Sequence, residues 1–514
     1  MRYGTCLFVR FLIVVFPSDQ EESFLMVFEL TDVSLLQSGA FIDGKVCESI
    51  SGSRVDVIDP ATSKIIGSVP EMNGEDSRKA IAAAETALAT WRTTTATVRS
   101  KHLHAWHRHV TDSAEDLAQL ITAECGKPLS ESRGEVAYAA SFLEWYAEEA
   151  KRAYGDIIPP HQEDKRLLVI RQPIGVAAAI TPWNFPAAMI LRKVAAALAA
   201  GCTMVVKPAP QTPLTALALH VLADRSGLPP GVLNTITGSI DSSRQIGSAI
   251  CESPTVRAIS FTGSTAAGVS LAQQAAGTVK KVSLELGGNA SFIVFDDANI
   301  EEAVQGALAA KFRNSGQTCV CANRFFVQSG VHDRFVKLFT AAVAQLRVGP
   351  GSEPDVTVGP LIDDRAYEKV RGIVADALTC GAQVTIGGSQ DSMEGRFFPP
   401  TVLTSANPQM RLATEEIFGP VAPVFKFETE EEVLQLANHT EFGLASYFYS
   451  QDINRCFRVA EAIECGMVGI NTGMLSTAVA PFGGVKNSGV GREGGKYGLD
   501  EYQELKYICL GGVH

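Results

Sequence analysis

The sequence has no excess of basic residues, and this limits the partners it can have. Lysine and arginine total 44 against 56 aspartate and glutamate residues, which gives a formal net charge of −12. Nucleic-acid binding draws much of its affinity from basic side chains at phosphates. We therefore expect no nucleic-acid partner, although this charge leaves room for local basic sites that bind small anions.

Long apolar segments are also scarce. Cys6 to Phe16 is apolar, but it contains Arg10 and is too short for a typical membrane helix. No other stretch reaches spanning length without charge, so we expect no membrane-embedded part. Residues 1–18 carry arginine and no acid, which fits a targeting segment or an extension upstream of a start at Met26.

The cysteines lack the pattern of a disulfide framework or a zinc site. They number 11, they are scattered from Cys6 to Cys509, and no pair of CxxC motifs occurs. We expect reduced thiols in a cytoplasmic protein, or in the mitochondrial matrix if residues 1–25 are a targeting segment. Histidines recur between His102 and His109, but no acid or cysteine set accompanies them in sequence, so we expect no metal.

The familiar nucleotide-binding loops are missing as well. GxGxxG occurs at Gly489–Gly494, but no apolar strand precedes it and too little chain follows for a βαβ unit. FTGSTAAG instead runs from a predicted strand into a predicted helix whose first turn holds no acid. Gly263 permits close backbone approach, and the helix that starts after Ser264 favours an anionic pyrophosphate at its N-terminus. We expect a dinucleotide to bind there.

The chain is 514 residues long, which is too long for a single compact core. From residue 175 to about 275, short apolar strands such as Thr203–Lys207 alternate with helical patterns such as Pro213–Ala223. A second series of this kind begins at Ser291. Because parallel strands need crossover helices, the sequence predicts an α/β fold with two doubly wound parallel sheets.

Three polar residues at predicted element ends point to acyl chemistry. Cys319 follows a Gly-containing turn and is a candidate nucleophile, the alternative being a buried structural thiol. Glu285 stands between two leucines, where burial would raise its pKa toward that of a general base; alternatively it points to water from an edge strand. Asn184 could donate to an oxyanion or simply satisfy a turn.

These residues lie within motifs that resemble the aldehyde dehydrogenase superfamily from about Leu30 to the C-terminus. PWNFP, FTGS, LELGGN, GQTC, EEIFGP and PFGG occur in the family's order, with Glu285 34 residues before Cys319. KFRNSGQTCVCANR and GGKYGLDEY are most similar to the succinate-semialdehyde dehydrogenases. One such motif would be weak evidence for the resemblance, but the ordered set of six is specific for this family.

The resemblance implies a mechanism. Cys319 attacks an aldehyde, Asn184 and the Cys319 N–H hold the oxyanion, and Glu285 activates the water that hydrolyses the thioester. It also implies a set of cofactor-binding residues besides the FTGS turn, namely Trp183, Lys207, Glu416 and Phe418.

The resemblance leaves the choice between NADP and NAD open. Many NAD-dependent relatives have a glutamate three residues after the lysine, but this chain has Pro210 there. Without that carboxylate a 2′-phosphate is not repelled, so we expect NADP to be accepted and NAD to remain possible.

The substrate expected from the resemblance is a small aldehyde that carries a carboxylate. Arg192, Arg313 and Ser476 match residues that bind the carboxylate in succinate-semialdehyde dehydrogenases, and guanidinium groups suit carboxylates geometrically. The two arginines could instead be structural ion-pair partners. Glutarate semialdehyde is the alternative substrate. Two rival functions are a thioester hydrolase, which the dinucleotide motifs oppose, and a non-catalytic relative, which the intact catalytic residues oppose.

The resemblance finally implies a domain plan and a homodimer or homotetramer. A small oligomerisation element combines a strand near Lys165–Arg171 with Tyr507–Leu510. Cys321 is a candidate redox switch with Cys319. The expected parts are an N-terminal extension (1–29), a dinucleotide-binding domain (30–287, interrupted by the oligomerisation strand at about 155–172), a catalytic domain (288–487) and a C-terminal oligomerisation segment (488–514).

Overall fold

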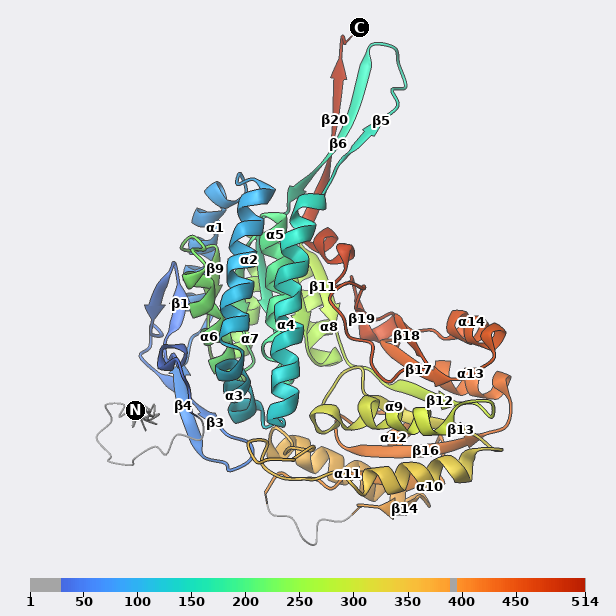
Figure 1. The fold of residues 1–514 in the computed structure, drawn as a ribbon. Helices are drawn as coiled ribbons and strands as arrows, with labels where there is room; N and C mark the ends of the chain where they lie inside the picture. Colours follow the sequence, from blue (N-terminus) through green and yellow to red (C-terminus); the bar gives the residue numbers. More distant parts are fainter. Residues whose placement is uncertain (1–28, 389–394, 514) are drawn as a thin grey trace, which may run out of the picture.

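The computed structural model describes residues 29–388 and 395–513. Two large sheets with helices on both faces dominate it, and a long hairpin projects from one side (Figure 1). The predicted α/β class with two wound sheets is confirmed. The predicted targeting segment and the alternative start at Met26 lie outside the described residues.

The first sheet has eight strands, and its central five are parallel. In spatial order they are β19 (Gly489–Val490), β11 (Lys281–Glu285), β10 (Val256–Thr262), β7 (Val176–Ile180), β8 (Thr203–Lys207), β9 (Leu233–Thr235), β1 (Ala40–Ile42) and β2 (Lys45–Cys47).

Successive side chains of β7 point to opposite faces of this sheet, as strand geometry requires. Ala177 and Ala179 pack in a core with helices α2 (Ala96–Asp112), α3 (Ala114–Cys125), α4 (Leu129–Glu149), α5 (Ala188–Ala200) and α6 (Pro213–Arg225). Val176 and Ala178 face the other core, with α1 (Gly74–Trp91), α7 (Ile240–Glu252) and α8 (Thr265–Ala275). Every residue of α5 is buried, which explains its almost wholly apolar sequence.

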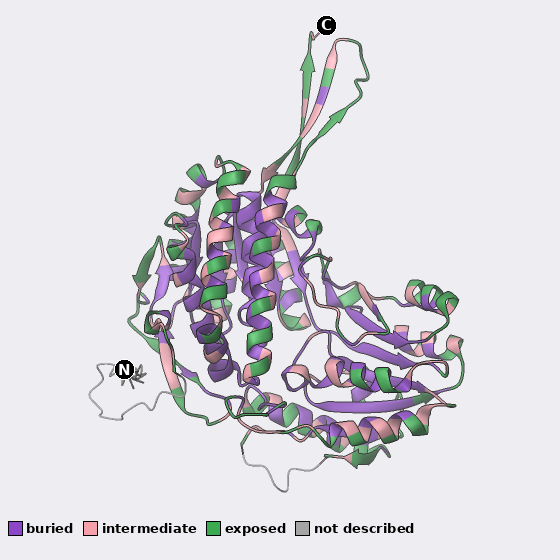
Figure 2. Cartoon of the chain, viewed as in Figure 1, coloured by how far each residue is buried: buried purple, intermediate pink, exposed green. Residues whose placement is uncertain are grey.

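The second sheet has seven strands, of which all but β14 run parallel. Their order is β14 (Gln383–Ile386), β15 (Thr401–Thr404), β16 (Val421–Phe427), β13 (Ala322–Gln328), β12 (Ala290–Val294), β17 (Ala445–Tyr449) and β18 (Met467–Ile470). One face carries α9 (Ile300–Phe312) and α10 (His332–Val343); the other carries α11 (Asp364–Thr379), α12 (Arg411–Thr414), α13 (Glu430–Asn438) and α14 (Ile453–Ala462). The central strands of each sheet are buried, whereas the edge strands β2 and β14 are mostly exposed (Figure 2).

The projecting element is an antiparallel sheet of β5 (Asp156–Ile158), β6 (Lys165–Pro173) and β20 (Gln503–Gly511). A separate two-stranded sheet joins β3 (Arg54–Ile58) to β4 (Ile65–Pro70). The projecting sheet is largely exposed, although it carries large apolar side chains at Ile157, Leu505 and Tyr507. Its role in assembly stays a prediction.

The expected C-terminal segment 488–514 is divided between two parts of the fold. Gly489 pairs with Glu285 in the first sheet, whereas residues 503–511 form the outer strand of the projecting element. The switch between sheets comes directly after Glu285, because β11 ends the first series and β12 opens the second. No helix in the described ranges is both long and apolar enough to cross a membrane.

Candidate active site

The turn that presents Cys319 has an unusual backbone. After α9 ends at Phe312, Asn314 and Ser315 adopt φ values of 50° and 57°, and Gly316 follows at 74°. A side chain at Gly316 would lie 2.2 Å from the Gly419 carbonyl, so glycine is required by both conformation and space. These left-handed residues store strain that the surrounding structure must hold.

Gln317 supplies part of that support from a fully buried position. Its side-chain carbonyl accepts from Ile362 N at 3.0 Å, and its amide donates to the carbonyls of Asn314 at 3.2 Å and Pro360 at 3.3 Å. Cys319 follows as a half-buried thiol, and every cysteine in the described part of the chain is free.

The charge environment of Cys319 works in two directions. Burial raises the pKa of its thiol to about 12, while the Arg192 and Arg313 guanidinium groups lower it. The two cations therefore oppose the effect of burial and favour the thiolate that attack requires.

Glu285 ends β11 in a buried position, 2% exposed, and neither carboxylate oxygen has a hydrogen-bond partner among the described residues. A Cβ at Gly483 would lie 2.8 Å from Glu285 Oε1, so the PFGG glycine makes room for the carboxyl group. Burial, and then the Glu493 carboxylate, raise the pKa of Glu285 well above its usual range. An unpartnered acid of this kind is suited to general-base chemistry on a water molecule.

Glu493 is a buried charge that the sequence reasoning missed. It pairs with both Arg192 and Lys193, and Ser260 donates to it at 3.0 Å. Burial acts to raise its pKa, but the two cations outweigh burial and hold the pKa below its usual range. Glu493 lies within the GVGREG stretch, which has the spacing of a dinucleotide motif but not its βαβ context. The stretch reaches the site because β19 pairs with the end of β11.

Asn184 sits in the loop between β7 and α5 and is 5% exposed. Its side-chain amide donates to the main-chain carbonyl of Gln317 at 3.0 Å, two residues before Cys319. A carboxamide has two N–H donors, so one remains for a substrate oxygen. This bond brings the PWNFP loop and the nucleophile turn together, as the sequence prediction needs.

The two candidate substrate arginines differ in whether a carboxylate of the protein already pairs with them. Arg192 is fully buried, pairs with Glu493 and stacks on Phe482 at 4.2 Å, which leaves its Nη1 unpartnered. Arg313 is half-buried, forms no ion pair with any described residue, and contacts the Met474 sulfur at 3.6 Å. Of the two guanidinium groups, only that of Arg313 lacks a carboxylate partner within the described chain.

The remaining candidates stay predictions. Ser476 is partly buried in the 471–480 loop. Cys321 is 2% exposed, and its thiol donates to the Lys311 carbonyl at 3.3 Å. A disulfide between Cys321 and Cys319 therefore requires the turn to rearrange.

The residues of the predicted dinucleotide site fit an anionic ligand. Ser264 caps α8 by accepting from Ala267 N at 3.4 Å, and the first turn of this helix is largely solvent-accessible and holds no acid. A Cβ at Gly263 would lie 2.4 Å from the Phe261 ring, so a side chain at this position would have to displace the ring. An exposed helix N-terminus beside a bare backbone is the arrangement that binds phosphate groups.

The other predicted cofactor residues lie on neighbouring loops. Trp183 and Phe418 stack edge to face with centroids 5.6 Å apart. Glu416 accepts from Gly288 N at 3.0 Å, and burial raises the pKa of Glu416 to about 7. Lys207 ends β8, and burial lowers the pKa of its ammonium group to about 7.

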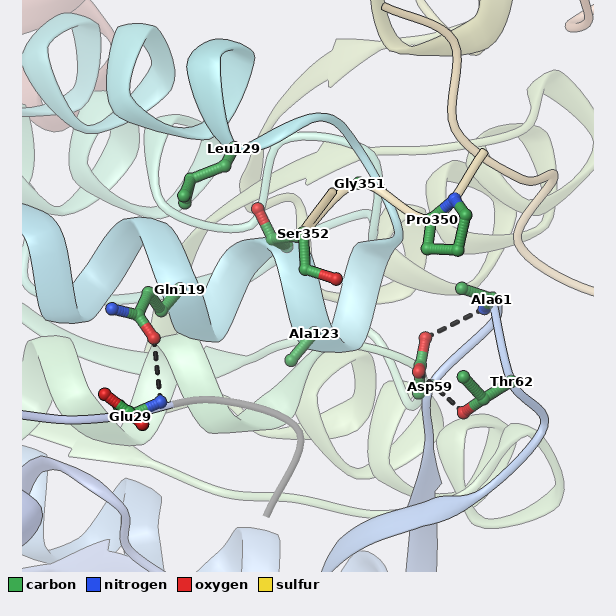
Figure 3. A pocket seen from close by; sticks show the side chains of 11 residues that line it. Glu29, Asp59, Ala61, Thr62, Gln119, Ala123, Leu129, Pro350, Gly351 and Ser352 are labelled. Atoms are coloured by element: carbon green, nitrogen blue, oxygen red, sulfur yellow. Dashed lines mark hydrogen bonds between the residues drawn. The ribbon is translucent and has the colours of Figure 1, made fainter. Parts of the chain in front are cut away.

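A separate hollow of about 380 Å³ lies between the N-terminal helices and the loop around Gly351 (Figure 3). Asp59 accepts from Ala61 N and the Thr62 hydroxyl, and Gln119 accepts from Glu29 N. These acceptors are already bonded to the wall of the hollow, so they offer a ligand little.

The histidine-containing helix α2 forms a side-chain hydrogen bond with a neighbouring helix. His104 Nε2 lies 2.8 Å from Glu148 on α4. Across the described ranges, no group of three or more His, Cys, Asp or Glu side chains is arranged to hold a metal ion.

Comparison with known proteins identifies the family. The sequence pattern described as "Aldehyde dehydrogenase family" matches residues 47–508. The chain belongs to the aldehyde dehydrogenase family. The glutarate-semialdehyde dehydrogenase of Pseudomonas aeruginosa is 56% identical over 94% of this chain and 100% of its own length. The succinate-semialdehyde dehydrogenase [NADP(+)] of Escherichia coli is 55% identical over 94% of this chain and 100% of its own length.

A solved structure agrees with these matches. The crystal structure of succinate-semialdehyde dehydrogenase from Burkholderia pseudomallei has a TM-score of 0.93 and 54% identity, covering 94% of this chain and 100% of that one. This aldehyde dehydrogenase is therefore an enzyme whose substrate is an aldehyde, as its sequence motifs predict.

Proposed function

We propose that this aldehyde dehydrogenase oxidises succinate semialdehyde to succinate with NADP or NAD. The observation that carries the choice of a carboxylate-bearing aldehyde is Arg313. Its half-buried guanidinium group interacts electrostatically with Cys319 and has no carboxylate partner among the described residues. A cation left unpaired beside a nucleophile suits an anionic substrate.

In this proposal the Cys319 thiolate, which Arg192 and Arg313 favour, attacks the aldehyde carbon and forms a thiohemiacetal. The free N–H of Asn184 and the backbone N–H of Cys319 donate to the oxyanion. A bound oxidised nicotinamide dinucleotide would supply the hydride acceptor, and loss of hydride from the thiohemiacetal carbon would leave a thioester on Cys319. Glu285 then removes a proton from water as the water oxygen attacks the thioester carbon. The carbon–sulfur bond breaks, the carboxylic acid is released, and the proton held by Glu285 is available to the departing Cys319 thiolate.

The dinucleotide would lie along α8 in this proposal. Gly263 and Ser264 would receive its pyrophosphate, Lys207 its adenosine ribose, Glu416 and Phe418 the nicotinamide ribose, and Trp183 would line the groove. The exposed, acid-free first turn of α8 supports the assignment.

Replacing Arg313 with alanine tests the substrate class. We expect Arg313→Ala to raise the KM for succinate semialdehyde about ten- to 150-fold, because losing a charged hydrogen bond costs about 1.5–3 kcal/mol. Butanal, which has the same length and no charge, should be affected much less. Steady-state kinetics with both aldehydes measures this, and an equal loss on both would make Arg313 a structural residue.

Arg192→Ala should behave differently, because Arg192 also pairs with the buried Glu493. We expect it to lower turnover of the charged and neutral aldehydes alike and to lower the melting temperature, since a buried carboxylate loses one of its two cations. A selective effect on the KM for succinate semialdehyde would instead assign Arg192 to the substrate carboxylate, as its motif position predicts.

Pro210 tests the cofactor preference. We expect Pro210→Glu to lower the ratio of kcat/KM for NADP to that for NAD by about tenfold or more, because a carboxylate there accepts from ribose hydroxyls and repels a 2′-phosphate. Pro210→Gln is the matched neutral control and should change the ratio much less. An unchanged ratio in Pro210→Glu would mean that position 210 does not face the ribose.

Glutarate semialdehyde is the second candidate substrate. The relative from Pseudomonas aeruginosa named for it is about as similar as those named for succinate semialdehyde. The two substrates differ by one methylene, which a pocket distinguishes by only about 1–3 kcal/mol. A direct comparison of kcat/KM for the two semialdehydes decides between them.

We also propose that the enzyme is a homo-oligomer, either a dimer or a tetramer, of the cytoplasm. The exposed apolar side chains of the projecting sheet support self-association, and the free cysteines support a reducing compartment.

A further inference from the structure

A buried ion pair lies behind the loop that carries Asn184. Lys127 follows the left-handed Gly126 after α3, and Glu135 lies in the second turn of α4. Their side chains are 1% and 0% exposed and form a direct ion pair. Neither residue belongs to a motif by which the sequence was interpreted, and the proposed mechanism does not use them.

Lys127 fixes the main chain at Asn184. Its ammonium group donates to the Asn184 carbonyl at 2.7 Å and lies 4.0 Å from the centre of the Phe185 ring. Asn184 is therefore bonded through its backbone carbonyl to Lys127 and through its side-chain amide to the nucleophile turn. A shift of the main chain at this residue would move the side-chain donor with it.

Glu135 fixes the other end of the same loop. Its Oε1 accepts from Ala187 N at 2.9 Å and Ala188 N at 3.3 Å, where α5 begins. The residue before α5 provides no side-chain cap, so Glu135 supplies the acceptor that the first N–H groups need. One ion pair thus holds the loop from residue 184 to residue 188 at both ends.

The loop is also tied to the turn that carries Cys319. The Asn314 side chain donates to the Asn184 carbonyl at 3.0 Å and to the Gln317 carbonyl at 3.2 Å. Glu131, four residues before Glu135, accepts from Asn314 N at 2.7 Å and so holds a residue of left-handed conformation. The start of α4 therefore supports the oxyanion donor and the nucleophile turn together.

We infer that Lys127 and Glu135 are positioning residues for the oxyanion hole, an inference that rests on the proposed role of Asn184. They act through the Asn184 main chain and touch neither substrate nor cofactor. Stability alone is a poor reason for the pair, because apolar residues of similar volume often replace a buried ion pair without loss of stability. Placing an oxyanion donor is a sufficient reason, because the donor nitrogen must lie about 2.7–3.1 Å from the position that the oxyanion will occupy.

The test uses the double variant Lys127→Met/Glu135→Gln, which leaves no unpaired charge. The introduced glutamine would retain a carbonyl oxygen for Ala187 N and Ala188 N, whereas the introduced methionine would donate nothing to the Asn184 carbonyl. We expect kcat/KM for the aldehyde to fall at least tenfold while the dissociation constant for NADP stays within twofold. Lys127→Arg is the milder variant if the double variant is poorly folded. It keeps the charge of the pair but changes the position of the donor to the Asn184 carbonyl, so it should lower kcat/KM in the same direction.

Glu124→Gln is the matched control. Glu124 is also a fully buried carboxylate on a neighbouring helix, and it accepts from Leu214 N and Thr215 N, both at 2.8 Å, at the start of α6. It has the same kind of capping bonds but does not contact the Asn184 loop. We expect this variant to change thermal stability and leave kcat/KM for the aldehyde unchanged.

Asn184→Ala separates positioning from general damage to the fold. If Lys127 and Glu135 act through Asn184, adding Lys127→Met/Glu135→Gln to Asn184→Ala should lower kcat/KM less than twofold further. A full additional tenfold loss, or an equal loss in Glu124→Gln, would overturn the inference. If Asn184→Ala itself keeps full activity, the proposed oxyanion role of Asn184 is wrong. If Asn184→Ala loses activity but Lys127→Met/Glu135→Gln keeps full activity, only the inference about Lys127 and Glu135 is wrong.

Discussion

Cys319→Ala is expected to abolish aldehyde oxidation, lowering kcat by roughly four orders of magnitude or more, because no other group can form the covalent intermediate. Cys321 is the nearest thiol along the chain, but it is buried and its thiol points to the Lys311 carbonyl. It cannot take over the attack without moving the turn. Reduced-nicotinamide absorbance with succinate semialdehyde as substrate measures the loss.

Dinucleotide affinity should survive this substitution. Gly263 and Ser264 belong to the β10–α8 junction, and the turn of Cys319 is held by other groups, namely Gln317 and Asn314. Equilibrium binding of NADP should therefore change by less than about twofold. Cys321→Ala is the matched control and should retain aldehyde oxidation. Full steady-state activity in Cys319→Ala would remove the covalent mechanism from the proposal.

Much of the fold follows from local patterns in the sequence. The strand at Thr203–Lys207 has the bounds that its apolar run predicts, and α6 begins at Pro213 because proline is favoured in the first turn of a helix. Strands buried on both faces give continuous apolar runs, which are easy to recognise. The order of the strands within each sheet does not follow in this way, because it depends on contacts between distant segments.

The parts of the site that sequence reasoning missed are those held by distant pairings. Glu493 reaches the site only because Gly489 pairs with Glu285, about 200 residues away in sequence. The sequence around Glu493 has the glycine spacing of a dinucleotide motif without the strand and helix that such a motif needs. A two-residue edge strand such as β19 is too short to give a periodic pattern in the sequence. The available signal was a glutamate among glycines, where the backbone can pack closely and a charge that becomes buried needs a partner elsewhere in the chain.

Lys127 and Glu135 were missed for a related reason. Their spacing of eight residues would be that of an exposed pair two turns apart on one helix, and charged residues are rarely fully buried. In the structure Lys127 lies before α4, which begins at Leu129, and its ammonium group donates to the Asn184 carbonyl. Whether such a charge is buried depends on the packing of α3, α4 and α5, which no single segment specifies.

Glu285→Gln should separate the two halves of the reaction. Glutamine has nearly the same shape but cannot accept a proton from water, so thioester hydrolysis should slow by a factor on the order of 10²–10⁴. Formation of the thioester should continue, because Arg192 and Arg313 still favour the Cys319 thiolate. Mixing the variant with NADP and succinate semialdehyde should therefore give a burst of absorbance close to one equivalent per active site, followed by slow turnover.

The pH dependence provides the second part of this prediction. Burial and Glu493 raise the pKa of Glu285, so the carboxylate needed for hydrolysis is lost earlier than usual as the pH falls. The hydrolysis rate of the wild-type enzyme should thus be full above this raised pKa and decline below it. Glu285→Gln should lose that decline, and Glu285→Asp, which keeps a carboxylate, should retain it with a lower rate. A variant that shows no burst, or that hydrolyses the thioester at the wild-type rate, would rule out Glu285 as the base.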